Sequence, residues 1–114
     1  IKKNLKEVYF NDSLITQKLI NRYHDLTLFK GNRDAFIDRA NIKRQDYSSK
    51  MKLIKTPTLI LWGENDFWIP VGDAYKFEEF IENSKVVIMP KTGHVPMEER
   101  PFESVKIALG FINP

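Results

Sequence analysis

The sequence has 114 residues, a formal net charge of +3, 42% hydrophobic and 29% charged residues. This composition suits one globular unit, and the absence of cysteine excludes a disulfide framework and thiolate metal sites. No apolar run approaches the roughly 20 residues that span a bilayer, and the lysines are scattered, so we expect a soluble, cytoplasmic protein without nucleic-acid or membrane partners.

The first third of the chain predicts a pair of amphipathic helices, after a lead-in over residues 1–10 that suits either a short helix or an extended segment. Thr16 or the cluster at residues 11–13 provides the first N-cap, and Gly31 separates this helix from a second one over residues 33–39. We expect the aromatic side chains of this region to pack in a core rather than face a substrate; they are Tyr9, Phe10, Tyr23, Phe29 and Phe36.

The middle of the chain predicts a strand, a helix and a second strand. A basic connection over residues 41–55 ends in Leu53 and Ile54, which we expect to pack against a sheet. The run from Thr58 to Trp62 is typical of a strand buried on both faces, and residues 85–89 form a similar run after a helical pattern over residues 72–83. Such a unit predicts two parallel, adjacent strands.

Two residues with catalytic chemistry follow these strands. Asp66 comes shortly after the first strand and His94 shortly after the second, so both loops open on the same edge of a parallel sheet. A carboxylate that accepts a hydrogen bond from one imidazole nitrogen leaves the other nitrogen free as a general base. The pattern predicts an acid and a base, without a nucleophile.

The remaining features are a closing helix and a possible pocket wall. Pro101 suits the first turn of a helix over residues 102–112, whose Phe102, Val105, Ala108, Leu109 and Ile112 we expect to face the sheet. Phe67 and Trp68 follow the acid and Val95 follows the histidine, so these three are candidates for a substrate pocket. The two histidines, His24 and His94, lack ligand spacing with carboxylates, so we expect no metal or other cofactor.

Residues 57–66 (Pro-Thr-Leu-Ile-Leu-Trp-Gly-Glu-Asn-Asp), then Gly93 with His94, then residues 98–101 (Glu-Glu-Arg-Pro) and a closing helix resemble the carboxyl-terminal part of an α/β-hydrolase. The resemblance implies that Asp66 is the acid and His94 the base of a catalytic triad, and that Glu64 makes a loop hydrogen bond instead. It implies that residues 1–48 are part of a helical cap and residues 49–114 the carboxyl-terminal part of the hydrolase core. Some relatives use a cap tyrosine to polarise an epoxide, for which Tyr23 and Tyr47 are the options.

The sequence departs from the family pattern because none of its serines is flanked as in Gly-x-Ser-x-Gly. We therefore expect a fragment that is inactive alone, from a full-length hydrolase of an ester-like small substrate that needs no cofactor. The alternative is a non-catalytic, α/β-hydrolase-like binding domain. Exposed strands could also let the chain associate with itself.

Overall fold

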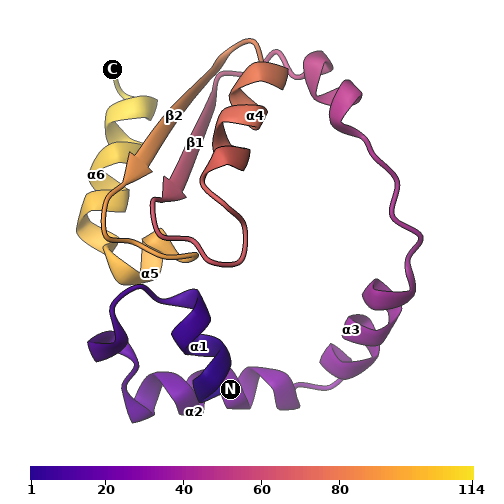
Figure 1. The fold of residues 1–114 in the computed structure, drawn as a ribbon, viewed down its shortest axis with the longest axis vertical. Helices are drawn as coiled ribbons and strands as arrows, with labels where there is room; N and C mark the ends of the chain where they lie inside the picture. The colour runs from indigo at the N-terminus through magenta and orange to yellow at the C-terminus, as the bar shows by residue number, and fades with distance from the viewer.

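The computed structural model describes residues 1–114 and divides into a helical first half and a mixed second half (Figure 1). The first half contains α1 (Lys2–Val8), the 3-10 turn η1 (Asp12–Leu14), α2 (Gln17–Leu28), α3 (Asn32–Asn41) and the 3-10 turn η2 (Ser48–Leu53). The second half contains β1 (Thr58–Gly63), α4 (Gly72–Phe80), β2 (Ser84–Met89), α5 (Pro96–Glu99) and α6 (Pro101–Ile112). None of the helices combines the length and apolarity needed to cross a bilayer.

Of the two N-caps that the sequence offered for the first long helix, the structure uses Thr16. The Thr16 hydroxyl accepts a hydrogen bond from the N–H of Leu19 at 3.2 Å and so caps the first turn of α2. Gly31 lies between α2 and α3 with a φ of 89°, a left-handed conformation that glycine adopts without a steric cost. These two residues set where α2 begins and where α3 can start.

The two strands pair in parallel, as predicted, with Thr58 opposite Ser84 and Gly63 opposite Met89. Helix α4 makes the crossover between them and packs on both strands. The carboxyl ends of β1 and β2 therefore meet at one edge of the sheet.

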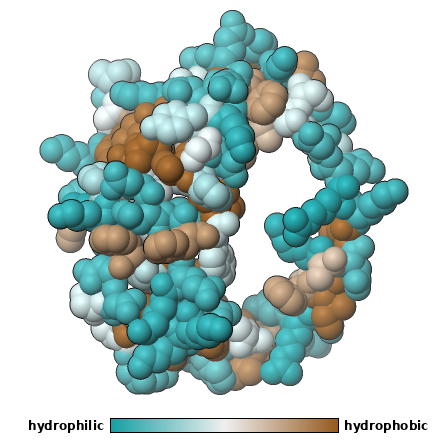
Figure 2. All heavy atoms as spheres, viewed as in Figure 1, coloured by the Kyte–Doolittle hydropathy of each residue, from teal (hydrophilic) through white to brown (hydrophobic).

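The chain as a whole forms an open ring rather than a filled globule. Helices α1 and α2 lie below the sheet unit, and α3 lies across an open centre from the strands, which the space-filling view also shows as empty (Figures 1 and 2). The radius of gyration is 16.3 Å, whereas a compact domain of this length has about 13 Å. Only 13 of 114 residues are buried, so many apolar side chains have no covering layer.

The predicted packing face of the last helix is wrong. Phe102 is 90% exposed, Val105, Leu109 and Ile112 are exposed as well, and only Ala108 of the predicted face is half-buried. The buried residue of α6 is Ser104, and the helix faces β1 with its other side. Helix α6 has apolar residues around most of its circumference, so periodicity alone could not select the inward face.

The prediction of a strand buried on both faces is also wrong for β1. Ile60 and Gly63 are buried, while the other residues of β1 are half-buried, including Trp62. Leu53 and Ile54, which we expected to pack against the sheet, are exposed. The reason is that β1 has a single neighbouring strand and few covering helices.

The aromatic residues of the first third divide into two groups. Tyr9 is buried and Tyr23 is half-buried, as the core interpretation requires. Phe10, Phe29 and Phe36 are exposed, so the core interpretation is wrong for them. Helix α3 packs mainly on α2, which leaves most of its surface uncovered.

Candidate active site

The loop after β1 is attached to the loop after β2 by main-chain hydrogen bonds. The N–H of Glu64 donates to the carbonyl of Met89, and the N–H of Asn65 donates to the carbonyl of Thr92, both at 2.9 Å. The Glu64 carboxylate accepts a weaker hydrogen bond from the N–H of Lys91, in the loop after β2, at 3.3 Å. Glu64 thus makes the loop hydrogen bond that the sequence predicted. Asp66 follows immediately and lies beside the chain that leads to residue 94.

The Asp66 carboxylate is oriented by three hydrogen bonds. Its Oδ1 accepts from the main-chain N–H groups of Trp68 and Ile69 at 2.9 and 3.0 Å. Its Oδ2 lies 2.8 Å from Nδ1 of His94. The Asp66 side chain is only 4% exposed, so the carboxylate is shielded from water, and its side-chain partner is the His94 imidazole.

The His94 imidazole has one occupied and one free nitrogen. The carboxylate at Nδ1 favours the tautomer with the proton on that atom, and Nε2 makes no hydrogen bond within the chain. The side chain remains 29% exposed, and the Trp68 ring lies against it at a centroid distance of 5.2 Å. An imidazole held in this way can accept a proton at Nε2.

Two glycines allow these loops to approach each other. A Cβ on Gly63 would lie 1.9 Å from the carbonyl oxygen of Gly93. A Cβ on Gly93 would lie 2.3 Å from the carbonyl oxygen of Val8. The backbone that precedes His94 is therefore packed between the end of β1 and the end of α1, with no room for a side chain on either side.

Sequence reasoning did not single out a carboxylate that binds this backbone. Glu99, in α5, is 8% exposed. Its Oε1 accepts from the N–H of Gly93 at 2.6 Å, and its Oε2 accepts from the N–H groups of Phe10 and Asn11 at 3.0 and 3.3 Å. The motif at residues 98–101 contained this residue, but burial of one glutamate of a pair cannot be read from sequence.

The adjacent Glu98 binds the helices of the first third. Its Oε2 accepts from the hydroxyls of Tyr9 at 2.5 Å and Tyr23 at 3.2 Å, and Arg22 lies 3.5 Å away. Burial raises the pKa of both tyrosines, and the neighbouring Glu98 carboxylate raises each pKa further. Both phenols are therefore neutral hydrogen-bond donors. Tyr47, the other tyrosine considered for epoxide polarisation, donates instead to a side chain two residues away.

The three candidate pocket residues have different surroundings. Trp68 contacts the His94 ring, as described above, and is half-exposed. Phe67 is 73% exposed. Val95 packs on the apolar cluster at the end of α1. The structure thus brings Trp68, but not Phe67, against the Asp66 and His94 pair.

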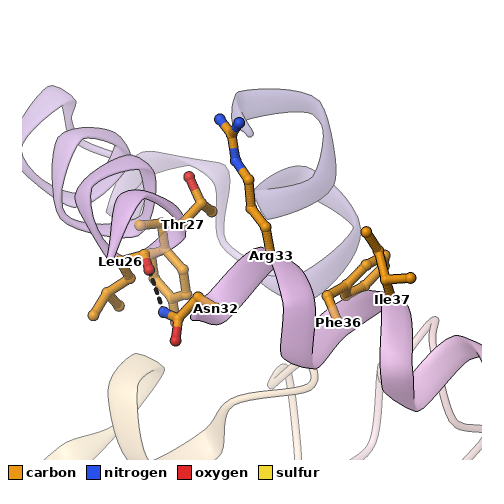
Figure 3. A pocket seen from close by; sticks show the side chains of 7 residues that line it. Leu26, Thr27, Asn32, Arg33, Phe36 and Ile37 are labelled. Atoms are coloured by element: carbon orange, nitrogen blue, oxygen red, sulfur yellow. Dashed lines mark hydrogen bonds between the residues drawn. The ribbon is translucent and has the colours of Figure 1, made fainter. Parts of the chain in front are cut away.

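A hollow of about 620 Å³ lies between α2 and α3 and is mainly apolar (Figure 3). It is lined by Tyr23, Leu26, Thr27, Asn32, Arg33, Phe36 and Ile37. Within it the Asn32 side chain donates to the carbonyl of Leu26 (Figure 3). Neither Asp66 nor His94 lines this hollow.

No serine hydroxyl hydrogen-bonds to His94, whose side chain is bound only by Asp66. The Ser104 hydroxyl donates into the α5–α6 turn, to the carbonyls of Pro96 and Arg100. The pair therefore has no nucleophile among the serines of this chain.

Residues 9–101 match the family model described as alpha/beta hydrolase fold. This chain is a member of the α/β-hydrolase fold family, as the sequence motifs indicated, and its two parallel strands with their helices are consistent with part of that fold. The predicted fold class is therefore confirmed.

Similar proteins include lipases and other hydrolases. Monoacylglycerol lipase ABHD6 of Mus musculus is 33% identical over 81 residues, which cover 70% of this chain and 24% of that protein. The uncharacterized hydrolase YugF of Bacillus subtilis (strain 168) is 30% identical over 105 residues, covering 89% of this chain and 37% of that protein. A solved serine hydrolase involved in carbazole degradation (CarC enzyme) superposes with a TM-score of 0.81 at 25% identity, covering 96% of this chain and 45% of that one. The chain thus spans less than half the length of each of these three proteins.

Proposed function

We propose that this chain supplies the acid and the histidine of a nucleophile–His–Asp triad that hydrolyses an ester-like small substrate. The single observation that carries the proposal is the 2.8 Å hydrogen bond between Oδ2 of Asp66 and Nδ1 of His94, with the carboxylate buried and Nε2 free. In this proposal the nucleophile, a serine or an aspartate, belongs to residues outside these 114.

In the proposed reaction, His94 Nε2 deprotonates a serine nucleophile, passes that proton to the leaving group and then activates the water that cleaves the covalent intermediate. The Asp66 carboxylate keeps the imidazole in its productive tautomer and stabilises the imidazolium that forms. These residues need no cofactor for either step.

The proposal gives this chain only part of the triad, because the chain covers only part of the length of its relatives. It spans 24% of the mouse lipase and 45% of the solved serine hydrolase. We assign residues 1–48 to part of a helical cap and residues 49–114 to the carboxyl-terminal part of the hydrolase core. The relative named a monoacylglycerol lipase supports an ester-like substrate for the full-length protein.

Two measurements test this proposal. The chain alone, incubated with a p-nitrophenyl ester, should give no more turnover than its His94→Ala variant, because it has no nucleophile. In the full-length protein that carries the nucleophile, both His94→Ala and Asp66→Asn should remove most of the esterase activity. Turnover by the chain alone above that of its variant, or full activity of both variants in the longer protein, would refute the proposal.

A second candidate function is a non-catalytic binding or self-associating domain. The observation that favours it is the exposed apolar side of α6, made up of Phe102, Val105, Leu109 and Ile112. The coding sequence that precedes residue 1 discriminates between the two candidates. A Gly-x-Ser-x-Gly motif or its aspartate equivalent there supports the enzyme, whereas a preceding hydrolase segment without either motif supports the binding domain.

A further inference from the structure

The Glu99 carboxylate is placed to control the backbone that carries His94. It accepts three main-chain hydrogen bonds, from Gly93 at 2.6 Å, Phe10 at 3.0 Å and Asn11 at 3.3 Å. These donors come from two segments far apart in the sequence, the loop after β2 and the turn after α1. One side chain thus ties the two segments together.

Glu99 is buried, with only 8% of its surface exposed, yet no cationic side chain forms an ion pair with it. Hydrogen bonds from N–H groups to a carboxylate are stronger than bonds between neutral groups, and here they are the compensation for burying the charge. Removing the carboxylate would leave N–H groups in this packed region without an acceptor. Glu99 is therefore bound to the loop more tightly than an ordinary surface glutamate.

The backbone of His94, the next residue along the loop, is hydrogen-bonded to the end of α1. The N–H of His94 donates to the carbonyl of Val8 at 2.8 Å. The N–H of Gly93 is held by Glu99, and the lack of a Cβ on Gly93 lets the backbone lie directly against Val8 and Glu99. The position of the imidazole relative to Asp66 therefore depends on where Glu99 holds residue 93.

We infer that Glu99 is a positioning residue of the proposed triad: it holds the loop so that His94 Nδ1 meets the Asp66 carboxylate. It does not touch the reacting atoms and acts through the backbone of Gly93. This inference rests on the proposed function for its catalytic consequence, although its structural consequence concerns the Asp66 and His94 pair alone.

The test compares Glu99→Gln with Glu103→Gln in the full-length protein. Glutamine has nearly the shape of glutamate, but its NH₂ group cannot accept, so at least one of the three main-chain bonds is lost. Glu103 is the matched control, because it is a half-exposed carboxylate on the neighbouring helix whose partner is Arg100. We expect Glu99→Gln to lower kcat by roughly 10- to 100-fold with KM little changed, as a displaced catalytic group does. Glu103→Gln should leave both parameters near their original values.

A second readout does not depend on turnover. In proton NMR spectra, the imidazole proton shared by His94 Nδ1 and Asp66 should give a resolved downfield signal, and the Gly93 amide should exchange slowly with solvent. We expect Glu99→Gln to broaden or remove that signal and to speed exchange at Gly93, while Glu103→Gln changes neither. If the glutamine variant does not fold, Glu99→Asp, which keeps the charge and shortens the side chain, carries the same two measurements.

The outcomes separate this inference from the proposed function. An unchanged imidazole signal and unchanged Gly93 exchange in a folded Glu99 variant would overturn the positioning role, whatever the activity. Loss of the signal in that variant, together with full esterase activity in His94→Ala, would support the positioning role and refute the proposed triad. Equal effects of the Glu99 and Glu103 substitutions would also overturn the inference, because they would reflect general loss of charge.

Discussion

Gly63, the last residue of β1, lies so close to Gly93 that a Cβ on it would come within 1.9 Å of the Gly93 carbonyl oxygen. The obstructing atom belongs to the backbone, which cannot rotate away as a side chain would. We expect Gly63→Ala to displace the loop that carries His94 and to lower the free energy of unfolding by about 1–3 kcal/mol, the usual effect of overpacking. Urea unfolding of the full-length protein measures this change.

Gly110 provides the matched control for this substitution. A Cβ on Gly110 would meet nothing within 4 Å, and the residue lies inside α6. Gly110→Ala should therefore raise the free energy of unfolding, by about 0.5–1 kcal/mol, because alanine loses less backbone entropy in a helix. Equal unfolding free energies for the two variants would contradict the close approach of Gly63 and Gly93.

The role proposed for Asp66 predicts a large kinetic effect of a nearly isosteric change. Asp66→Asn retains an oxygen that can accept from the N–H groups of Trp68 and Ile69, but it removes the negative charge beside His94. We expect kcat for ester hydrolysis by the full-length protein to fall by about 10⁴-fold, because the imidazole loses its favoured tautomer and its charge partner. Steady-state kinetics checks this value.

The control for Asp66 is Asp73→Asn, which alters an aspartate that pairs with Lys76 on α4. Its kcat should stay within a factor of about two, since surface ion pairs contribute little. A loss of activity in Asp66→Asn no larger than that in Asp73→Asn would show that residue 66 is not the triad acid.

The two tyrosines that bind Glu98 predict a loss of stability at alkaline pH. Burial raises the pKa of Tyr9, and that of Tyr23, above the ordinary value of 10.0. Above pH 10 the unfolded chain releases these protons while the folded chain keeps them, so the free energy of unfolding falls as the pH rises. Each tyrosine contributes a slope of at most about 1.4 kcal/mol per pH unit.

Tyr9→Phe tests this linkage, because it removes one of the two raised groups. The variant should be less stable at neutral pH by about 1 kcal/mol, since Glu98 loses a donor, and its alkaline slope should be shallower than that of the original chain. Tyr75, which is half-exposed on α4, is the control, and Tyr75→Phe should not cost the stability at neutral pH that Tyr9→Phe costs. Denaturant unfolding at several pH values between neutrality and the alkaline limit gives these slopes. Parallel curves for all three proteins would contradict the linkage.

The exposed side of α6 predicts self-association of the 114-residue chain on its own. Phe102 and Leu109 lie on this side, and large exposed apolar patches favour association. We expect the double variant Phe102→Gln with Leu109→Gln to sediment as a smaller species than the original chain.

Lys106→Gln with Glu103→Gln is the control pair, because it changes the same number of positions on α6 without reducing the apolar side. Its sedimentation should match that of the original chain. A monomeric original chain at every concentration would contradict the role of this surface in association.

The sequence by itself determined the two strands, the helices α2, α3, α4 and α6, and the order of the candidate site residues, whereas α5 and the 3-10 turn η2 fall in segments for which no helix was predicted. Strands with apolar runs, glycine at the end of β1 and the capping threonine of α2 are local features, and local propensity and patterning were sufficient for them. The parallel arrangement followed from the single crossover, and it brought Asp66 and His94 to one edge, where the structure places them 2.8 Å apart.

Only the tertiary structure decided which surfaces are buried and what holds the loops. Burial of α6 and β1 depends on which other elements cover them. The periodicity of hydrophobic residues within one element does not show how many elements pack against it. The contacts of Glu99 with residues 10 and 11 join positions almost 90 apart in the sequence, so no local pattern encodes them. The physical reason is that a buried carboxylate needs hydrogen-bond donors, and the whole fold decides which distant segments lie close enough to provide them.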